Sequence, residues 1–272
     1  MESFTVNIKY NANFFERLLW KKRLKNFNEI ILPTDWKDLT ADQLANVAAV
    51  LFTKNDEADA MAELFVKLTG LNKWQLLYLN IDEVYSFMKP CLDFIKKPIL
   101  IELPIIKAIP NSGKFGPREL MQGLCWKQFA LAEALVNDFT ENKDMTMLDS
   151  LCALLYCTKE NPTQDEWYLG MQEAEQTRLE KIYAGMPLKN KQAVYLNYLG
   201  LKRHMAQSGV FKYMYPNSDK PLLSNCDNKK EAIDWHAVTI SLAGGKFGTL
   251  QELYYTSAFD VLKHLDMESK NK

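Results

Sequence analysis

Residue patterns that accompany enzymatic chemistry are missing from this sequence. The three histidines form neither H-x-x-x-H nor H-E-x-x-H, and no two cysteines have the C-x-x-C spacing of a zinc site. No serine stands in the G-x-S-x-G pattern of a nucleophile elbow. We therefore expect no catalytic residue, no metal ligand and no cofactor, and we interpret the protein as not an enzyme.

Long apolar runs and an excess of either charge are missing too. No run approaches the roughly 18 apolar residues of a transmembrane helix. No basic segment precedes an apolar one at the N-terminus, so we expect neither a membrane span nor a secretory signal. The 33 Lys and Arg residues nearly balance the 34 Asp and Glu residues. This balance gives no general attraction to nucleic acid or to an anionic membrane.

Cysteine is scarce, and its number is odd. The five cysteines are Cys91, Cys125, Cys152, Cys157 and Cys226. Most of them lie in apolar contexts, which is typical of buried free thiols in a reducing compartment. We therefore expect the protein in the cytoplasm.

Helix signals dominate the rest of the sequence. Thr40 followed by Gln43 is a capping box, and Gly70 is placed to end a second helix that starts near residue 58. Further helices are predicted over 145–157, 166–186, 187–207, 231–243 and 249–266. The expected fold class is mostly α, a multi-helix bundle.

Three segments depart from the helical pattern. Residues 3–10 alternate apolar and polar side chains, which predicts a short N-terminal strand or extended arm. Three prolines in 96–112 predict an extended connector or edge hairpin, and the polar stretch 208–231 predicts a long loop. The expected regions, which could all form one domain, are a helical region over 1–95, a connector over 96–112, a central helical region over 113–207, a loop over 208–230 and a helix pair over 231–268.

The tetrapeptide GKFG occurs twice, at 113–116 and at 245–248. Phenylalanine follows the lysine in both copies, where a phosphate-binding P-loop needs Ser or Thr, so we interpret both as structural joints. Each phenylalanine side chain is expected to be buried in the core. Gly116 would cap a helix with Pro117 at its first position, and Thr249 would start another. The predicted structural turn residues are Gly113, Gly116, Pro117, Gly244, Gly245 and Gly248.

Aromatic and methionine side chains are the candidates for binding a partner. Trp36 and Trp167 stand near helix starts beside acidic residues, and we expect them to be exposed. A second group flanks the long loop and could line a groove for an amphipathic helix: Met205, Phe211, Tyr213, Met214 and Tyr215. The alternative is that these side chains cover the core.

Four segments together resemble a group of proteins from phages and prophages of Bacteroidetes. They read LPTDWKDLTADQL, KFGPRELMQGLCWKQFALAEAL, LDSLCALLYC and WHAVTISLAGGKFGTLQELYYTSAFDVLKHLDM. The shared pattern is a Gly-Pro turn before an aromatic-rich helix, a leucine-rich helix, and a terminal helix pair. The chain departs from it at Cys125–Trp126, where the group has threonine and an aromatic residue, and at Cys157, where the group has a basic residue.

The resemblance implies a non-enzymatic phage assembly protein, because the group is encoded among tail genes. Its most concrete form is a tail assembly chaperone that binds the tape-measure protein in the host cytoplasm. The alternative is a structural virion component, such as a connector, ring or cargo protein, that self-associates through 1–10 and 96–112. A weaker alternative is a helical DNA-binding protein that uses Lys21, Lys22, Arg23 and Lys25. The balanced charge argues against nucleic acid as a partner.

Overall fold

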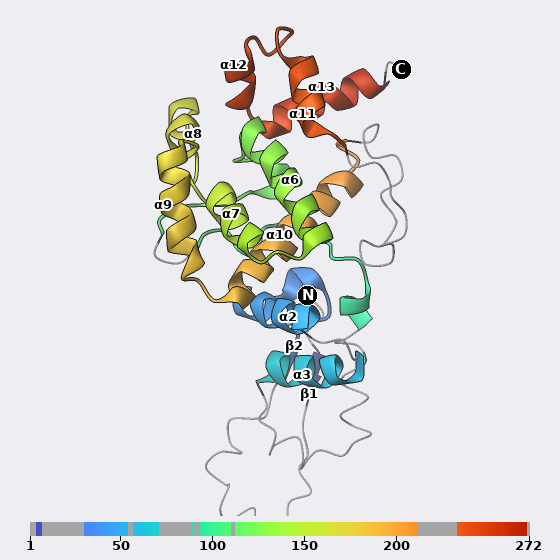
Figure 1. Ribbon diagram of the computed structural model, residues 1–272. Coiled ribbons are helices and arrows are strands. Elements are labelled where there is room, and N and C mark those ends of the chain that lie inside the picture. The colour runs from blue at the N-terminus through green and yellow to red at the C-terminus, as the bar shows by residue number, and fades with distance from the viewer. Residues whose placement is uncertain are drawn as a thin grey trace, which may run out of the picture. The chain divides into compact units, whose positions relative to one another are not determined.

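The computed structural model describes residues 4–6, 30–53, 57–70, 89, 93–109, 112–211 and 233–270. These residues are mostly helical, which confirms the predicted fold class (Figure 1). The chain divides into two compact units, Met1–Lys97 (unit 1) and Pro98–Lys272 (unit 2). None of the helices described has the length and apolar character needed to cross a bilayer.

Unit 1 contains a two-stranded sheet and a helix pair. Strand β1 (Phe4–Val6), within the stretch predicted as strand or arm, pairs antiparallel with β2 (Ile30–Leu32). The capping box at the start of α2 (Ala41–Thr53) is confirmed: the Thr40 N–H donates to Gln43 Oε1 over 2.9 Å, and the Gln43 N–H donates to Thr40 Oγ1 over 3.2 Å. Helix α3 (Glu57–Thr69) ends at Gly70, whose φ of 69° confirms the predicted helix stop.

Trp36 lies in the core of unit 1, so the prediction that it is exposed was wrong. Its side chain is 3% exposed in the short 3-10 helix η1 (Trp36–Asp38). The ring meets the edge of Phe94 with centroids 5.4 Å apart, and its Nε1 donates to the Lys97 carbonyl over 3.4 Å. The free energy gained by burying the large indole, with its N–H hydrogen-bonded, outweighs the preference of the adjacent acidic residues for water.

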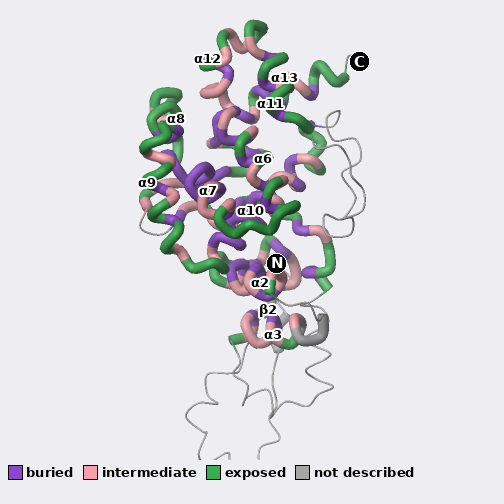
Figure 2. Tube along the Cα trace, viewed as in Figure 1, coloured by how far each residue is buried: buried purple, intermediate pink, exposed green. Residues whose placement is uncertain are grey.

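Four helices form the core of unit 2. They are α6 (Trp126–Asn142), α7 (Thr146–Leu155), α9 (Glu173–Ala184) and α10 (Leu188–Gln207). Helix α7 packs against the other three. Its residues 151–155 are all buried, as are residues 191–198 of α10 (Figure 2). The predicted helices 145–157 and 187–207 are therefore confirmed.

The helix predicted to start at Gly116 and Pro117 starts instead at Trp126. Residues 116–118 are not helical, and η2 (Glu119–Met121), which follows them, contains left-handed residues at Leu120 and Met121. Gly116 has a role in packing rather than in capping: a Cβ added there would lie 2.5 Å from Cζ of Tyr156. The N-cap of α6 is Cys125, whose N–H donates to the Gln128 side chain over 3.0 Å.

Two of the predicted helices are each broken in two. The helix predicted over 166–186 consists of α8 (Gln164–Gly170) and α9, and the one predicted over 249–266 consists of α12 (Leu250–Tyr254) and α13 (Ala258–Lys270). In the second case, the Ala258 N–H donates to the Leu124 carbonyl, and the Thr256 carbonyl accepts from the Trp126 N–H. These tertiary hydrogen bonds take the place of helix continuation. Helix α11 (Trp235–Leu242) lies within the predicted range 231–243.

From residue 98 to 109 the connector is irregular, without helix or strand, and it is hydrogen-bonded to α10. The Ile101 N–H donates to the Gly200 carbonyl over 3.2 Å. The Asn197 side chain accepts from the Ile105 N–H over 2.9 Å. The connector therefore belongs to the core of unit 2, because α10 satisfies its backbone donors in place of a sheet partner.

Candidate docking groove

The residues predicted to line a groove beside the long loop do not do so where the structure describes them. Met205 and Phe211 are 0% exposed, so they cover the core, which was the alternative interpretation. Phe211 meets the ring of Phe259 with centroids 5.6 Å apart. Tyr213, Met214 and Tyr215 lie outside the described residues. Trp167 is half-buried on α8 rather than exposed, and its role in binding stays a prediction.

The second GKFG copy is a turn whose glycine N–H groups are already hydrogen-bonded. Gly244 and Gly248 have left-handed φ values of 82° and 74°. The Gly244 N–H donates to the Gly248 carbonyl over 2.7 Å, and the Gly248 N–H donates to the Gly245 carbonyl over 3.1 Å. A phosphate-binding loop needs such N–H groups directed at its ligand. Phe247 and Phe115 are half-buried, so the prediction that they plug the core was wrong.

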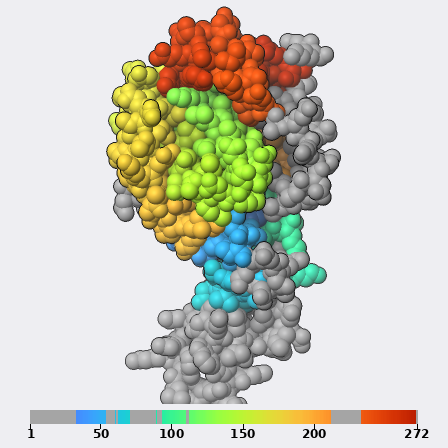
Figure 3. Space-filling model, in the orientation of Figure 1, coloured from blue at the N-terminus to red at the C-terminus, as the bar shows by residue number. Residues whose placement is uncertain are grey.

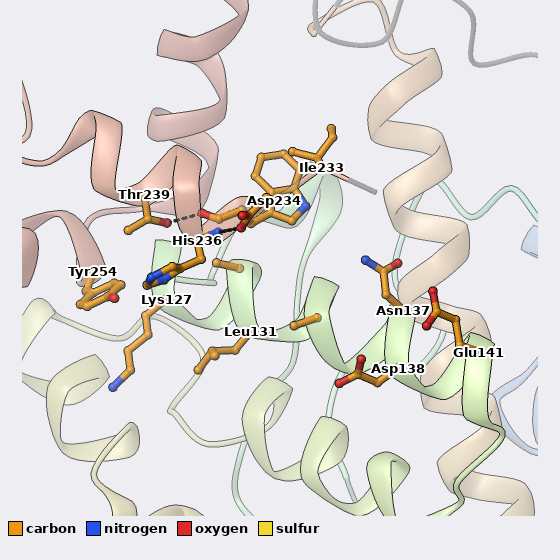
Figure 4. Close-up of a pocket in the computed structure, with 13 residues that line it drawn as sticks. Lys127, Leu131, Asn137, Asp138, Glu141, Ile233, Asp234, His236, Thr239 and Tyr254 are labelled. Carbon is orange, nitrogen blue, oxygen red and sulfur yellow. Dashed lines mark hydrogen bonds between the residues drawn. The ribbon is translucent and has the colours of Figure 1, made fainter. Parts of the chain in front are cut away.

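A groove that the sequence analysis missed lies between α6 and α11 (Figure 4). It has a volume of about 390 Å³, and Tyr254 of α12 borders it at one end. Its α6 lining consists of Lys127, Ala130, Leu131, Ala134, Asn137, Asp138 and Glu141. These positions recur at intervals of three and four, which places them along one face of the helix. Figure 3 shows α6 and α7, in green, at the surface of unit 2 between α9 and the C-terminal helices.

An aromatic cluster beneath the groove holds α11 against α6. The rings of Trp126, Phe129 and Trp235 lie with centroids 5.1 to 5.7 Å apart. Trp126 Nε1 donates to Thr239 Oγ1 over 2.8 Å. Asp234 caps α11 by accepting from the His236 N–H over 3.0 Å. Because these rings are buried and the Trp126 N–H is hydrogen-bonded, the two walls of the groove are set without a ligand.

The α6 wall of the groove is apolar in its middle, and the groove is open. Leu131 is 44% exposed and Ile233 is 48% exposed, one on each wall. Ala130 and Ala134 lie one turn apart on α6 and carry no side chain beyond Cβ. Small side chains let another backbone approach closely, and exposed aliphatic side chains beside them gain from being covered.

The two ends of the groove carry opposite charge. Lys127 and Tyr254 lie at one end, with the ammonium group 5.8 Å from the centre of the tyrosine ring. Asn137, Asp138 and Glu141 lie at the other end (Figure 4). The carboxyl end of α6 adds a partial negative charge to the acidic end.

The three thiols that the structure describes in unit 2 do not suit catalysis. Cys125, Cys152 and Cys157 are free and buried, as predicted, and burial raises the pKa of each to about 12. A thiol with so high a pKa is protonated at neutral pH and is a poor nucleophile. Within the residues that the structure describes, no three His, Cys, Asp or Glu side chains are grouped as metal ligands.

Two charged residues of α9, Glu175 and Arg178, form a surface ion pair. Arg178 donates two hydrogen bonds of 2.8 Å to the carboxylate of Glu175 and thereby lowers the pKa of that carboxyl group. Lys114 lies 3.4 Å from the same carboxylate. These carboxylate contacts are structural and indicate no acid–base site on α9.

Comparison of the chain with known protein families, with curated proteins and with solved structures finds no match.

Proposed function

We propose that the protein is a non-enzymatic phage assembly protein, most concretely a tail assembly chaperone. In this proposal the groove between α6 and α11 binds an amphipathic helix of the tape-measure protein. The phage setting rests on the resemblance of the four sequence segments, and the binding mode rests on the groove.

The observation that carries the proposal is the spacing of the groove residues on α6. Lys127, Ala130, Leu131, Ala134, Asn137, Asp138 and Glu141 stand at positions i, i+3, i+4, i+7, i+10, i+11 and i+14. This is the stripe along which a second helix packs in a coiled coil. Its outer positions are charged and its centre is apolar, so the fitting occupant is an amphipathic helix with charged residues at both ends.

A photo-crosslinking experiment in the native source tests the proposal. Benzoylphenylalanine replaces Leu131 in the groove or, as the control, Leu188 at the start of α10, which is 42% exposed. We expect crosslinks from position 131 to helical segments of one long protein, and few from position 188. A synthetic peptide of the crosslinked segment should then bind the wild-type protein, and Leu131→Lys should weaken that binding at least tenfold while Leu188→Lys does not.

Mass spectrometry of purified particles separates the chaperone from the virion alternative. A chaperone is absent from finished particles. Stoichiometric presence in particles, with crosslinks from position 131 to other copies of the chain, would contradict the chaperone and support a connector, ring or cargo protein. Crosslinks to cellular proteins that lack an amphipathic helix would contradict both.

A further inference from the structure

The ends of the α6–α11 groove differ in charge, and their separation along α6 is known. Lys127 and Asp138 are 11 residues apart, and Lys127 and Glu141 are 14 residues apart. At about 1.5 Å per helical residue these separations are roughly 16 and 21 Å. A bound helix that follows the stripe would therefore meet a cation at one end and carboxylates three to four turns away.

The charges at the acidic end are placed to meet a partner. Asp138 and Glu141 are both exposed and line the groove on the same face of α6. The cationic side chain among the α6 lining residues, Lys127, is at the opposite end (Figure 4). A helix with the wrong charge at the acidic end would meet like-charge repulsion there, whereas a basic side chain would be attracted.

We infer that the groove selects its helix by charge order: basic side chains lie opposite Asp138 and Glu141, and an acidic side chain lies three to four turns away opposite Lys127. This inference rests on the proposed function, because it concerns the helix that the groove binds. The apolar centre supplies affinity for any amphipathic helix. The charged ends decide which helix is bound and in which register.

A display library of amphipathic helical peptides tests the inference with the full-length protein. The peptides have about five turns, roughly 18 residues, with a fixed apolar stripe and with Lys, Glu or Gln randomised at the end positions. Wild-type protein should enrich peptides that are basic at one end and acidic at the other over peptides with like charges at both ends, by roughly fivefold at low salt. The preference should shrink as added salt screens the charges.

Charge-reversal variants sharpen the test because the same library is used for each. The double variant Asp138→Lys, Glu141→Lys should enrich peptides that are acidic at both ends, and Lys127→Glu should enrich peptides that are basic at both ends. The matched control, Glu102→Lys with Glu160→Lys, reverses two exposed acids away from the groove and should keep the wild-type preference. Circular dichroism of each variant checks whether it is folded.

The outcomes distinguish failure of this inference from failure of the proposed function. Enrichment of amphipathic peptides that Leu131→Lys abolishes, with no preference among end charges, would overturn the charge-order inference and leave the docking groove in place. Equal enrichment by wild-type protein and by Leu131→Lys would overturn both. A shift of preference in the control double variant would also count against the groove charges as the cause.

Discussion

The two GKFG copies have the same four residues and different structures. In the first copy, Phe115 makes isolated bridges with Ala108 and Thr158, and Gly116 is buried against Tyr156. In the second, Gly248 has a left-handed φ of 74° in an exposed turn between two helices. The residues that follow each copy contribute to the difference. Thr249 with Glu252 makes a capping box and starts α12 at once, whereas Pro117 and Leu120 at the equivalent positions cannot make one.

The comparison shows that a short repeated motif does not fix its own conformation. The first copy is held by contacts with residues more than forty positions away, since the Phe115 N–H donates to the Thr158 carbonyl and Lys114 Nζ donates to the Cys157 carbonyl. The second copy is held mainly by hydrogen bonds within residues 242–252, with one ring contact from Phe247 to His264 of α13. Changes in the first copy should therefore affect the whole of unit 2, and changes in the second should remain local.

Replacing one glycine of each copy with alanine should give the largest contrast in stability between the two copies. Gly116→Ala places a Cβ against the ring of Tyr156, whose hydroxyl is fixed by donating to the Ile106 carbonyl over 2.8 Å. We expect a loss of roughly 2–3 kcal/mol in the free energy of unfolding. Gly245→Ala is the matched control, because its Cβ would lie 3.5 Å from the nearest atom and its φ is not left-handed. Urea denaturation measures both, and equal effects would contradict the assignment of Gly116 as a packing glycine.

Alkaline pH should have the second-largest effect on stability, through Cys157. The carbonyl of this residue accepts a hydrogen bond from Lys114 of the first copy. Burial raises the pKa of the Cys157 thiol from its ordinary value of 9.0 to about 12. The folded state therefore keeps a proton that the unfolded state loses, so the stabilisation is complete below pH 9 and falls as the pH rises toward 12. We expect this thiol to reduce the free energy of unfolding by up to about 1.4 kcal/mol per pH unit in that window. Urea denaturation of Cys157→Ala should show a shallower decline than the wild type, and an unchanged slope would contradict the prediction.

Removing the cap of the second copy should have a smaller and local effect. Thr249→Ala deletes the hydroxyl that accepts from the Glu252 N–H over 3.3 Å and donates to the Glu252 carboxylate over 2.9 Å. Loss of an N-cap costs about 1 kcal/mol, so amide hydrogen exchange over 249–256 should speed up by roughly fivefold. Exchange over 113–124 should not change. Thr249→Ser keeps the hydroxyl and should restore most of the protection, and equal acceleration in both segments would show that the two copies are coupled.

The lysines of the two GKFG copies should show the smallest contrast. It should appear in their chemical reactivity rather than in the free energy of unfolding. Lys114 Nζ donates to the Cys157 carbonyl over 2.9 Å and is part-buried, whereas Lys246 is exposed. An amine engaged in this way is less available to an acylating reagent. We expect Lys246 to be labelled several-fold faster than Lys114 in the native protein, as measured by peptide mass spectrometry. In urea the two rates should converge, and a difference that persists there would mean that local sequence, not folding, causes it.

Signals confined to a few adjacent residues were predictable from the sequence. The capping box at Thr40 and the stop at Gly70 depend on hydrogen bonds and φ values within a single turn, and both are confirmed. The break between α12 and α13 was not predictable, because a hydrogen bond from Ala258 to Leu124 competes with helix continuation. The burial of Trp36 was missed for a similar reason, since Phe94 and Lys97 are distant in the sequence.

The groove shows most clearly what the sequence contributes and what the tertiary structure contributes. The sequence by itself determined that α6 is a helix and that Lys127, Leu131 and Asp138 share one face of it. Only the tertiary structure decided that this face stays open, because α11 packs on the neighbouring face through Trp126 and Trp235 and leaves the stripe uncovered beside it. Helical periodicity is local, whereas exposure depends on which distant segments bury apolar surface against each face.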